Sequence, residues 1–250
     1  MTGWREVGDQ VYVRRHTDLD LNCGLVVGTS GCLVVDTGAH LGQGQDLADA
    51  VRAVTPRPWT VVNTHAHYDH CFGNAAFRPA AVWGARGCAA SLRADGEQQR
   101  RTVAAELRAA GDPGADRVAA APIDPPDSLV DAVTLLDVGG RTVTLTHPGR
   151  GHTDGDLVVA VDDVLFAGDL VEEGAPPAME DAFPLEWPAT LTAVLGQVRG
   201  TVVPGHGDVV GAAFVAGQRD ELALLADWLT GRTAELPFDE PTRRTARSRL

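Results

Sequence analysis

The heptapeptide THAHYDH, residues 64–70, gathers three of the chain's eight histidines, and Asp69 stands beside the last of them. The apolar run WTVVN directly before it predicts a strand that leads into this cluster. Because side chains alternate along an extended chain, His65, His67 and Asp69 are expected on one side, where two imidazoles can share a metal ion. His70 has the opposite parity, so it is expected to approach a second ion through a bend.

Three more residues of metal-ligand type follow later strands. His152 lies in PGRGHTDGD, Asp169 follows VLFAG, and His206 lies in VVPGHGD. Glycines beside each of them permit the sharp turns that would aim these side chains inward. Together with the HxHxDH cluster, they predict a metal centre. A single histidine at a strand end is ordinarily structural, and the remaining three are interpreted that way: His16, His40 and His147.

Short apolar runs bounded by glycine or aspartate predict strands in both halves of the chain. In the first half we expect an antiparallel meander of three strands, at 10–15, 23–28 and 31–36. One further strand is expected at 59–63, and two helices at 42–54 and 89–110. A connection rich in proline and aspartate, near 115–131, marks the expected seam between the halves. The second half is predicted to hold five strands, at 132–138, 141–147, 156–161, 163–169 and 201–204. Two helices are predicted at 188–198 and 212–231.

Strands precede helices in each half without strict alternation. That order favours two mixed β-sheets with helices outside over a doubly wound parallel sheet. The expected fold class is therefore α/β (α+β), with one domain over 1–234 built from two βα halves. Residues 235–250 are polar and rich in arginine, and we expect a loosely held C-terminal tail there.

Composition excludes several classes of function. The formal net charge is −13, and every one of the 21 basic residues is arginine, so the chain is poorly suited to nucleic acid and has no lysine for a Schiff base. No apolar run approaches the roughly 20 residues of a membrane-spanning helix, and no secretory signal is visible, so a cytoplasmic location without a membrane partner is expected. The four cysteines are irregularly spaced and are interpreted as reduced core thiols.

The motifs VVDTG, THAHYDH, GHTDGD, FAGDL and PGHG, in that order, resemble those of the metallo-β-lactamase superfamily across most of the chain. The resemblance implies a four-layer αββα sandwich with a metal site at one edge of the sheets. It implies that Asp36 fixes the ligand loops through hydrogen bonds. It also implies a ligand set: His65, His67 and His152 for one metal ion, Asp69, His70 and His206 for a second, and Asp169 bridging both.

Such a ligand set predicts hydrolysis by a dinuclear centre holding two Zn²⁺, with iron or manganese as other possible metals. Two ions that share a water lower its pKa, so a bridging hydroxide can attack an acyl carbonyl while Asp69 orients it. No serine or cysteine nucleophile is needed, and no GxSxG motif is present. The expected substrate is a small molecule with a thioester, lactone or related ester or amide bond. The acidic loop that begins at Glu172 is expected to border the site.

Three alternatives stay open from the sequence. A mononuclear iron-dependent dioxygenase of the persulfide type would use His65, His67, His152 and Asp169. A β-lactamase-like amidohydrolase is the second, although the chain lacks a lysine to receive a lactam carboxylate. A non-catalytic scaffold is the third, and the complete ligand set weighs against it. The sequence does not determine the oligomeric state.

Overall fold

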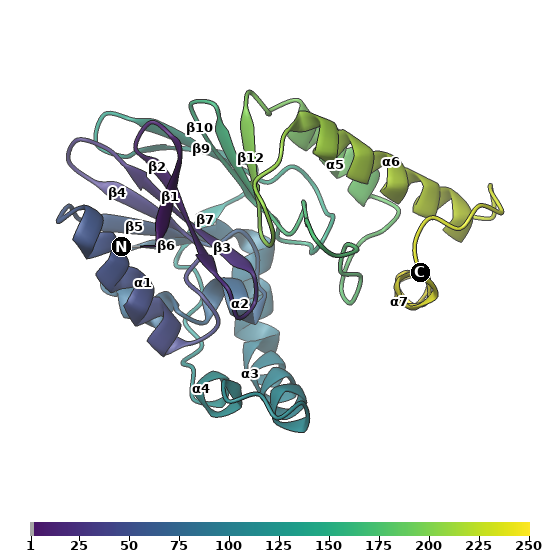
Figure 1. Cartoon of the computed structure of the whole chain (residues 1–250), viewed down its shortest axis with the longest axis horizontal. Coiled ribbons are helices and arrows are strands. Elements are labelled where there is room, and N and C mark those ends of the chain that lie inside the picture. Colours follow the sequence, from purple (N-terminus) through teal and green to yellow (C-terminus); the bar gives the residue numbers. More distant parts are fainter. Residues whose placement is uncertain (1–2) are drawn as a thin grey trace.

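Two β-sheets lie face to face in the structure, a computed structural model that describes residues 3–250 (Figure 1). The first sheet has seven strands in chain order: β1 (Trp4–Gly8), β2 (Val11–His16), β3 (Leu21–Val27), β4 (Cys32–Val35), β5 (Trp59–Val62), β6 (Val82–Ala85) and β7 (Ser128–Val130). Strands β1 to β4 pair antiparallel, and β4 to β7 pair parallel. Strands β2 to β4 confirm the predicted meander, whereas β1 and β6 were not predicted.

The second sheet has five strands in the order β12-β11-β10-β9-β8. Its pairs are antiparallel except for β11 with β12. The bounds are β8 (Val133–Asp137), β9 (Thr142–Thr146), β10 (Val158–Val161), β11 (Val164–Gly168) and β12 (Thr201–Pro204). The chain leaves the first sheet at Val130 and enters the second at Val133, at the end of the segment where the seam was expected.

The two sheets bury a shared apolar core between them. Val26, Leu33 and Val62 of the first sheet belong to the same buried cluster as Val159 and Phe166 of the second. Gly24 of β3 permits the close approach, because a Cβ atom there would lie 2.4 Å from Cε1 of Phe166. Burial of this apolar surface is the main force that holds one sheet against the other.

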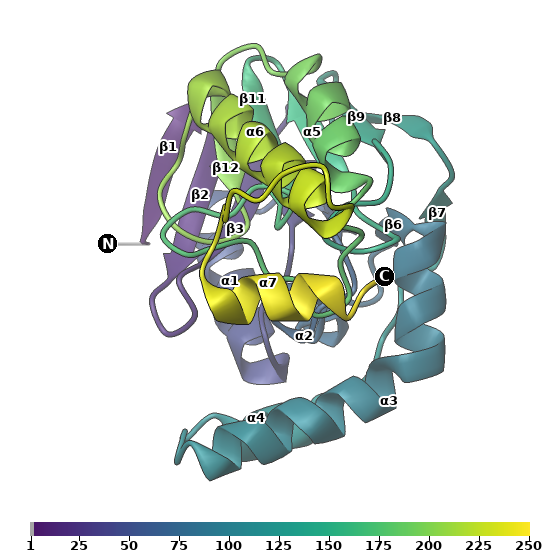
Figure 2. The same ribbon diagram turned by 90° about the vertical axis from the view of Figure 1, so that its right-hand side faces the viewer.

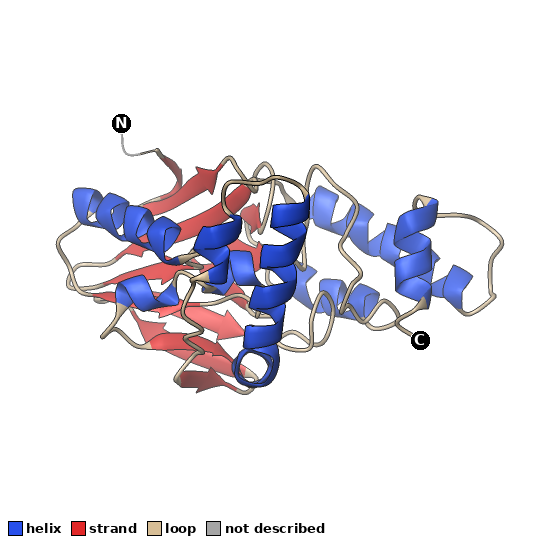
Figure 3. Ribbon diagram, turned by 90° about the horizontal axis from the view of Figure 1, so that it is seen from below, coloured by secondary structure: helices blue, strands red, loops and turns tan. Residues whose placement is uncertain are grey.

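Helices cover both outer faces, as Figure 3 shows in blue beside the red strands. Helix α1 (Leu41–Val54) packs Leu47 and Val51, one turn apart, onto the first sheet. Helices α5 (Trp187–Leu195) and α6 (Ala212–Leu229) cover the second sheet with a separate apolar cluster. The layers are thus helix, sheet, sheet, helix, which confirms the predicted fold class. No helix within residues 3–250 is long and apolar enough to cross a membrane.

Four helical segments lie between β5 and β7: α2 (Tyr68–Cys71), the 3₁₀ helix η1 (Asn74–Phe77), α3 (Arg86–Ala109) and α4 (Ala115–Ala119). Helices α3 and α4 project away from the sandwich (Figures 1 and 2). The segment near 115–131 is therefore not only a connection, because it contributes α4 and the strand β7, whose pairing partner β6 lies some 45 residues earlier.

The C-terminal segment differs from the expectation of a loosely held tail. It forms helix α7 (Glu240–Arg247), which begins at the N-cap Asp239 and crosses below α5 and α6 in Figure 2. Ala246 is fully buried in the cluster that covers the second sheet. Arg249 donates hydrogen bonds to the carbonyl oxygens of Asp181 and Ala182, at 3.2 and 3.1 Å. The tail therefore packs on the acidic loop beside the site.

Candidate metal centre

The predicted ligands come from loops at one edge of both sheets. His65 and His67 follow β5, and the chain then turns into α2, which carries Asp69 and His70. This turn supplies the bend that His70 needs. It also moves Asp69 away from the side of His65 and His67, where alternation along an extended chain had placed it. The second sheet and its loops supply the other three: His152, Asp169 and His206.

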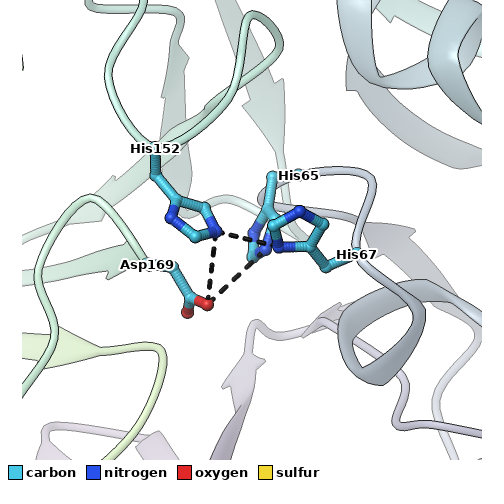
Figure 4. A group of neighbouring side chains, drawn as sticks. All are labelled: His65, His67, His152 and Asp169. Atoms are coloured by element: carbon cyan, nitrogen blue, oxygen red, sulfur yellow. Dashed lines mark hydrogen bonds and ion pairs between the residues drawn. The ribbon is translucent and has the colours of Figure 1, made fainter. Parts of the chain in front are cut away.

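The seven side chains form two adjacent groups. In each group, one ligand atom from every member lies within 4.8 Å of the others. The first group joins His65, His67, His152 and Asp169 (Figure 4). The second group joins Asp69, His70 and His206.

Asp169 touches both groups. Its Oδ2 lies 3.6 Å from Nε2 of His65 and 3.6 Å from Nε2 of His152. Its Oδ1 lies 3.2 Å from Nε2 of His70, and Oδ2 is 3.5 Å from Nε2 of His206. One carboxylate is thus placed between four imidazoles, so it can serve two cations at once.

Two glycines make room for this carboxylate. Gly168, directly before Asp169, has φ of 53°, a backbone conformation that favours glycine. A Cβ atom on Gly205 would lie only 1.7 Å from Oδ1 of Asp169. Glycine is therefore required at position 205, since any larger residue there would displace the Asp169 side chain.

Backbone hydrogen bonds fasten the ligand loops of one sheet to the other. On β3 of the first sheet, Asn22 donates its main-chain N–H to the carbonyl of Gly205, at 2.8 Å, and its side-chain Nδ2 to Pro204 and Gly207. Leu157 of the second half donates its N–H to the carbonyl of Thr64, at 2.7 Å. The loops that carry His65 and His206 are thereby held on a rigid support.

Asp36 is buried and contacts two residues of the cluster segment. Its carboxylate accepts hydrogen bonds from the N–H and hydroxyl of Thr64, both at 2.8 Å. Its Oδ2 lies 2.9 Å from Nδ1 of His70. Because a carboxylate can only accept, Nδ1 of His70 carries the proton, and Nε2 faces the second group.

Two further acidic residues contact the histidines and were not singled out from the sequence. Asp181 lies 3.1 Å from Nε2 of His67, and Nδ1 of the same ring lies 2.9 Å from Nε2 of His152. Glu172 Oε1 lies 3.5 Å from Nδ1 of His152. Both belong to the acidic loop that was expected to border the site. Nothing in that loop's composition indicated which carboxylates would reach the histidines.

Charge and burial at the centre suit cations. Burial lowers the pKa of His65 well below its ordinary value and that of His152 to about 4. Burial also lowers the pKa of His67, but the hydrogen bond and charge of Asp181 outweigh it and raise the pKa to about 8. For Asp169, burial raises the pKa, but the neighbouring His70 and His65 outweigh this effect and hold it well below the ordinary value.

The residues fit divalent metal ions. Among residues 3–250, few buried side-chain atoms lack a hydrogen-bond partner, and two of them face the groups: Nε2 of His65, 3.6 Å from Oδ2 of Asp169, and Oδ1 of Asp169, 3.2 Å from Nε2 of His70. Three imidazoles present their other nitrogen to a fixed acceptor: His67 to Asp181, His70 to Asp36 and His206 to the carbonyl of Leu19. Such acceptors set the ring orientation of metal-binding histidines. Nitrogen and oxygen donors in these numbers suit zinc, iron or manganese.

The histidines that were interpreted as structural lie outside both groups. His40 caps α1 through Nδ1, and Nδ1 of His147 contacts the carbonyl of Asp156 at 2.8 Å. Cys71 is buried, which raises the pKa of its thiol well above the ordinary value. All four cysteines are free and buried.

Comparison with known proteins agrees with this geometry. The family model of the metallo-beta-lactamase superfamily matches residues 16–212. The chain belongs to the metallo-β-lactamase superfamily. Among curated relatives, it is 29% identical over 210 residues to the acyl-coenzyme A thioesterase MBLAC2 of Gallus gallus, covering 76% of this chain and 74% of that protein. It is also 29% identical over 196 residues to a metallo-beta-lactamase type 2 of Bacillus cereus, covering 74% and 67%.

Solved structures share the fold at lower identity. A metallo-beta-lactamase from Pontibacter korlensis superposes with a TM-score of 0.69 at 20% identity, covering 88% of this chain and 98% of that one. The metallo-beta-lactamase FIM-1 from Pseudomonas aeruginosa, in a mono-zinc form, gives 0.66 at 18% identity, covering 88% and 96%. With its superfamily and its His/Asp groups, the chain is a metal-dependent hydrolase.

Proposed function

We propose that this protein is a dinuclear zinc hydrolase that cleaves an acyl bond of a small molecule: a thioester, a lactone or a related ester or amide. One observation supports it above the others, namely that the Asp169 carboxylate contacts both ligand groups. Two ions held by those groups would share this carboxylate. The residues that would hold them are those implied by the resemblance: His65, His67 and His152 for one, Asp69, His70 and His206 for the other, with Asp169 bridging.

When bound, two zinc ions polarise an acyl carbonyl as Lewis acids and activate water as the nucleophile. Asp69 is the residue we assign to orienting that water, because it lines the cavity beside the centre and is only 8% exposed. Its Oδ2 is held 3.3 Å from Nε2 of His206. Asp36 and Asp181 hold the imidazoles of His70 and His67 in place. Cys71 stays a buried thiol, which does not suit it to attack a substrate.

The second ligand group also favours this proposal over a mononuclear iron dioxygenase. A mononuclear centre would need only His65, His67, His152 and Asp169, so it gives no reason for Asp69 and His206 to lie 3.3 Å apart beside Asp169. The bond that is cleaved is open among thioester, lactone and amide. The relatives are named for thioester and β-lactam substrates.

Metal analysis and a substrate panel test the proposal together. We expect two zinc ions per chain, loss of activity with a chelator and its return with Zn²⁺. The panel contains acyl thioesters, lactones and a chromogenic β-lactam, with oxygen consumption followed in parallel. One iron per chain with oxygen uptake, or full hydrolysis after complete removal of metal, would refute the proposal.

A further inference from the structure

A cavity of about 690 Å³ opens beside the metal centre and is lined by Asp69, His152, Asp169 and His206 among others. These four lining residues belong to the two ligand groups, so the cavity opens directly onto the metal centre. One wall is a face of α3, and the opposite wall is the loop 172–181. Leu19, Tyr68 and Val103 add apolar surface.

The walls carry a one-sided charge. Besides Asp69 and Asp169, six carboxylate residues line the cavity: Asp20, Glu106, Glu172, Glu173, Glu180 and Asp181. No arginine lines it within residues 3–250, and the whole sequence contains no lysine. Two divalent ions would bring four positive charges to the two carboxylate ligands, Asp69 and Asp169, at the reacting end of the cavity. The carboxylates of Glu106, Glu173 and Glu180 are not ligands and would keep the outer wall negative.

Three of the six wall carboxylates have no basic side chain to neutralise them: Glu106, Glu173 and Glu180. Asp20 pairs with Arg15, and Asp181 pairs with His67. Glu172 lies 3.5 Å from Nδ1 of His152, and burial raises the pKa of Glu172 to about 8. Glu173 accepts a hydrogen bond from the backbone N–H of Asp208, at 2.7 Å, which leaves its charge in place. Glu106 and Glu180 are exposed, and neither forms an ion pair in the described part of the chain.

Building on the proposed function, we infer that the acyl substrate of this site bears a cationic group, such as a quaternary or protonated amine, which lies against the acidic wall while the acyl carbonyl faces the metal centre. A negatively charged substrate would meet several like charges in a partly enclosed cavity without one arginine to pair with. Coenzyme A carries phosphates and β-lactam antibiotics carry a carboxylate, so neither class suits this wall. The chain would thus differ in substrate charge from the relatives named above.

Three thioesters that share one acyl group and differ in the thiol test the inference. The thiols are 2-(trimethylammonio)ethanethiol, its neutral isostere 3,3-dimethylbutane-1-thiol and the anionic 3-mercaptopropionate. For the zinc-loaded protein, we expect kcat/KM for the cation to exceed that for the neutral isostere by about tenfold, and the anion to be slowest. The preference should shrink in 0.5 M salt, because salt screens the exposed part of the wall.

Substitutions test whether the carboxylates of the acidic wall cause the preference for the cationic thioester. The double substitution Glu106→Gln with Glu180→Gln should reduce the ratio between cation and neutral isostere at least about threefold. Asp95→Asn is the matched control, since Asp95 is an exposed carboxylate on the same helix that does not line the cavity. That control should leave the ratio unchanged.

Binding of uncleavable thioether analogues with the same three head groups, measured by calorimetry, separates the inference from the proposed function. Equal affinities, or tighter binding of the anion, would overturn the charge preference even if all three thioesters are cleaved. If the cation binds best and no acyl compound of the panel is cleaved, the proposed function fails while the charge preference stands.

Discussion

Replacing Asp181 with alanine is expected to weaken zinc binding by an amount that depends on pH. The Asp181 carboxylate acts on His67 in two opposed ways from a distance of 3.1 Å. It accepts the Nε2 proton and so leaves Nδ1 free for metal, and loss of such a partner weakens metal binding by about 10- to 100-fold. It also raises the pKa of His67 to about 8, so a proton competes with the metal at neutral pH.

The two effects have different pH dependence. In the wild type, where the pKa of His67 is about 8, proton competition weakens the apparent affinity for zinc about 11-fold at pH 7.0 and about 1.3-fold at pH 8.5. Without Asp181, an imidazole with the ordinary pKa of about 6.5 would weaken zinc affinity by proton competition only about 1.3-fold at pH 7.0 and hardly at all at pH 8.5. Because Asp181 is 50% exposed, we take the lower limit of about tenfold for lost orientation. Asp181→Ala should therefore match the wild type at pH 7.0 and bind zinc about eightfold more weakly at pH 8.5.

Competition with a chromophoric chelator at the two pH values measures both affinities. Asp181→Asn is the informative companion, because it keeps an oxygen acceptor without the charge and should retain its affinity at pH 8.5. Asp95→Asn controls for the loss of one exposed negative charge. The reasoning is refuted if Asp181→Ala weakens binding equally at both pH values or not at all at pH 8.5.

Three further predictions concern turnover, metal retention and stability. Asp69→Asn should lower kcat by at least about 100-fold, and activity close to that of the wild type in a zinc-loaded sample would contradict its role. Gly205→Ala should reduce bound zinc to less than one ion per chain by metal analysis, because the new Cβ would overlap the Asp169 carboxylate; unchanged content would show that the loop yields. Burial lowers the pKa of His16 to about 4, so the unfolded chain takes up a proton first as pH falls. Between pH 6.5 and 4 this should cost the metal-free protein about 3 kcal/mol, a loss that His16→Gln should lack in urea unfolding; equal losses would exclude His16 as the cause.

The sequence was sufficient for the features that depend on local pattern. Short apolar runs predicted the meander and all five strands of the second sheet, and the order of strands and helices predicted the layers. The HxHxDH spacing and the glycine-flanked His152, Asp169 and His206 predicted which side chains gather. Their assignment to metal ions is still a proposal, but their convergence follows from strands that end at one edge.

Features that depend on distant parts of the chain were missed. Strand β7 has three residues in a proline-rich segment, and its pairing with β6 is invisible locally. Helix α7 had a signal, because Asp239 followed by Pro241 is a typical helix start. The segment was still expected to be loose, since Ala246 is its one buried residue and charged side chains dominate the rest. The acidic wall could not be predicted, since it requires knowing that α3 faces the loop 172–181.

The outer walls of the cavity, formed by α3 and residues 172–181, contain none of the seven clustered ligands. Ligands follow strands whose backbones are fastened to each other, as Asn22 fastens the loop of His206. The exposed Glu106 lies on α3, which supplies no ligand, and the exposed Glu180 lies eleven residues after Asp169 on the connection between β11 and α5. Natural or laboratory evolution can therefore diversify these outer positions while the reaction is inherited unchanged, and a mutant library restricted to them would sample new substrates at little cost in folding.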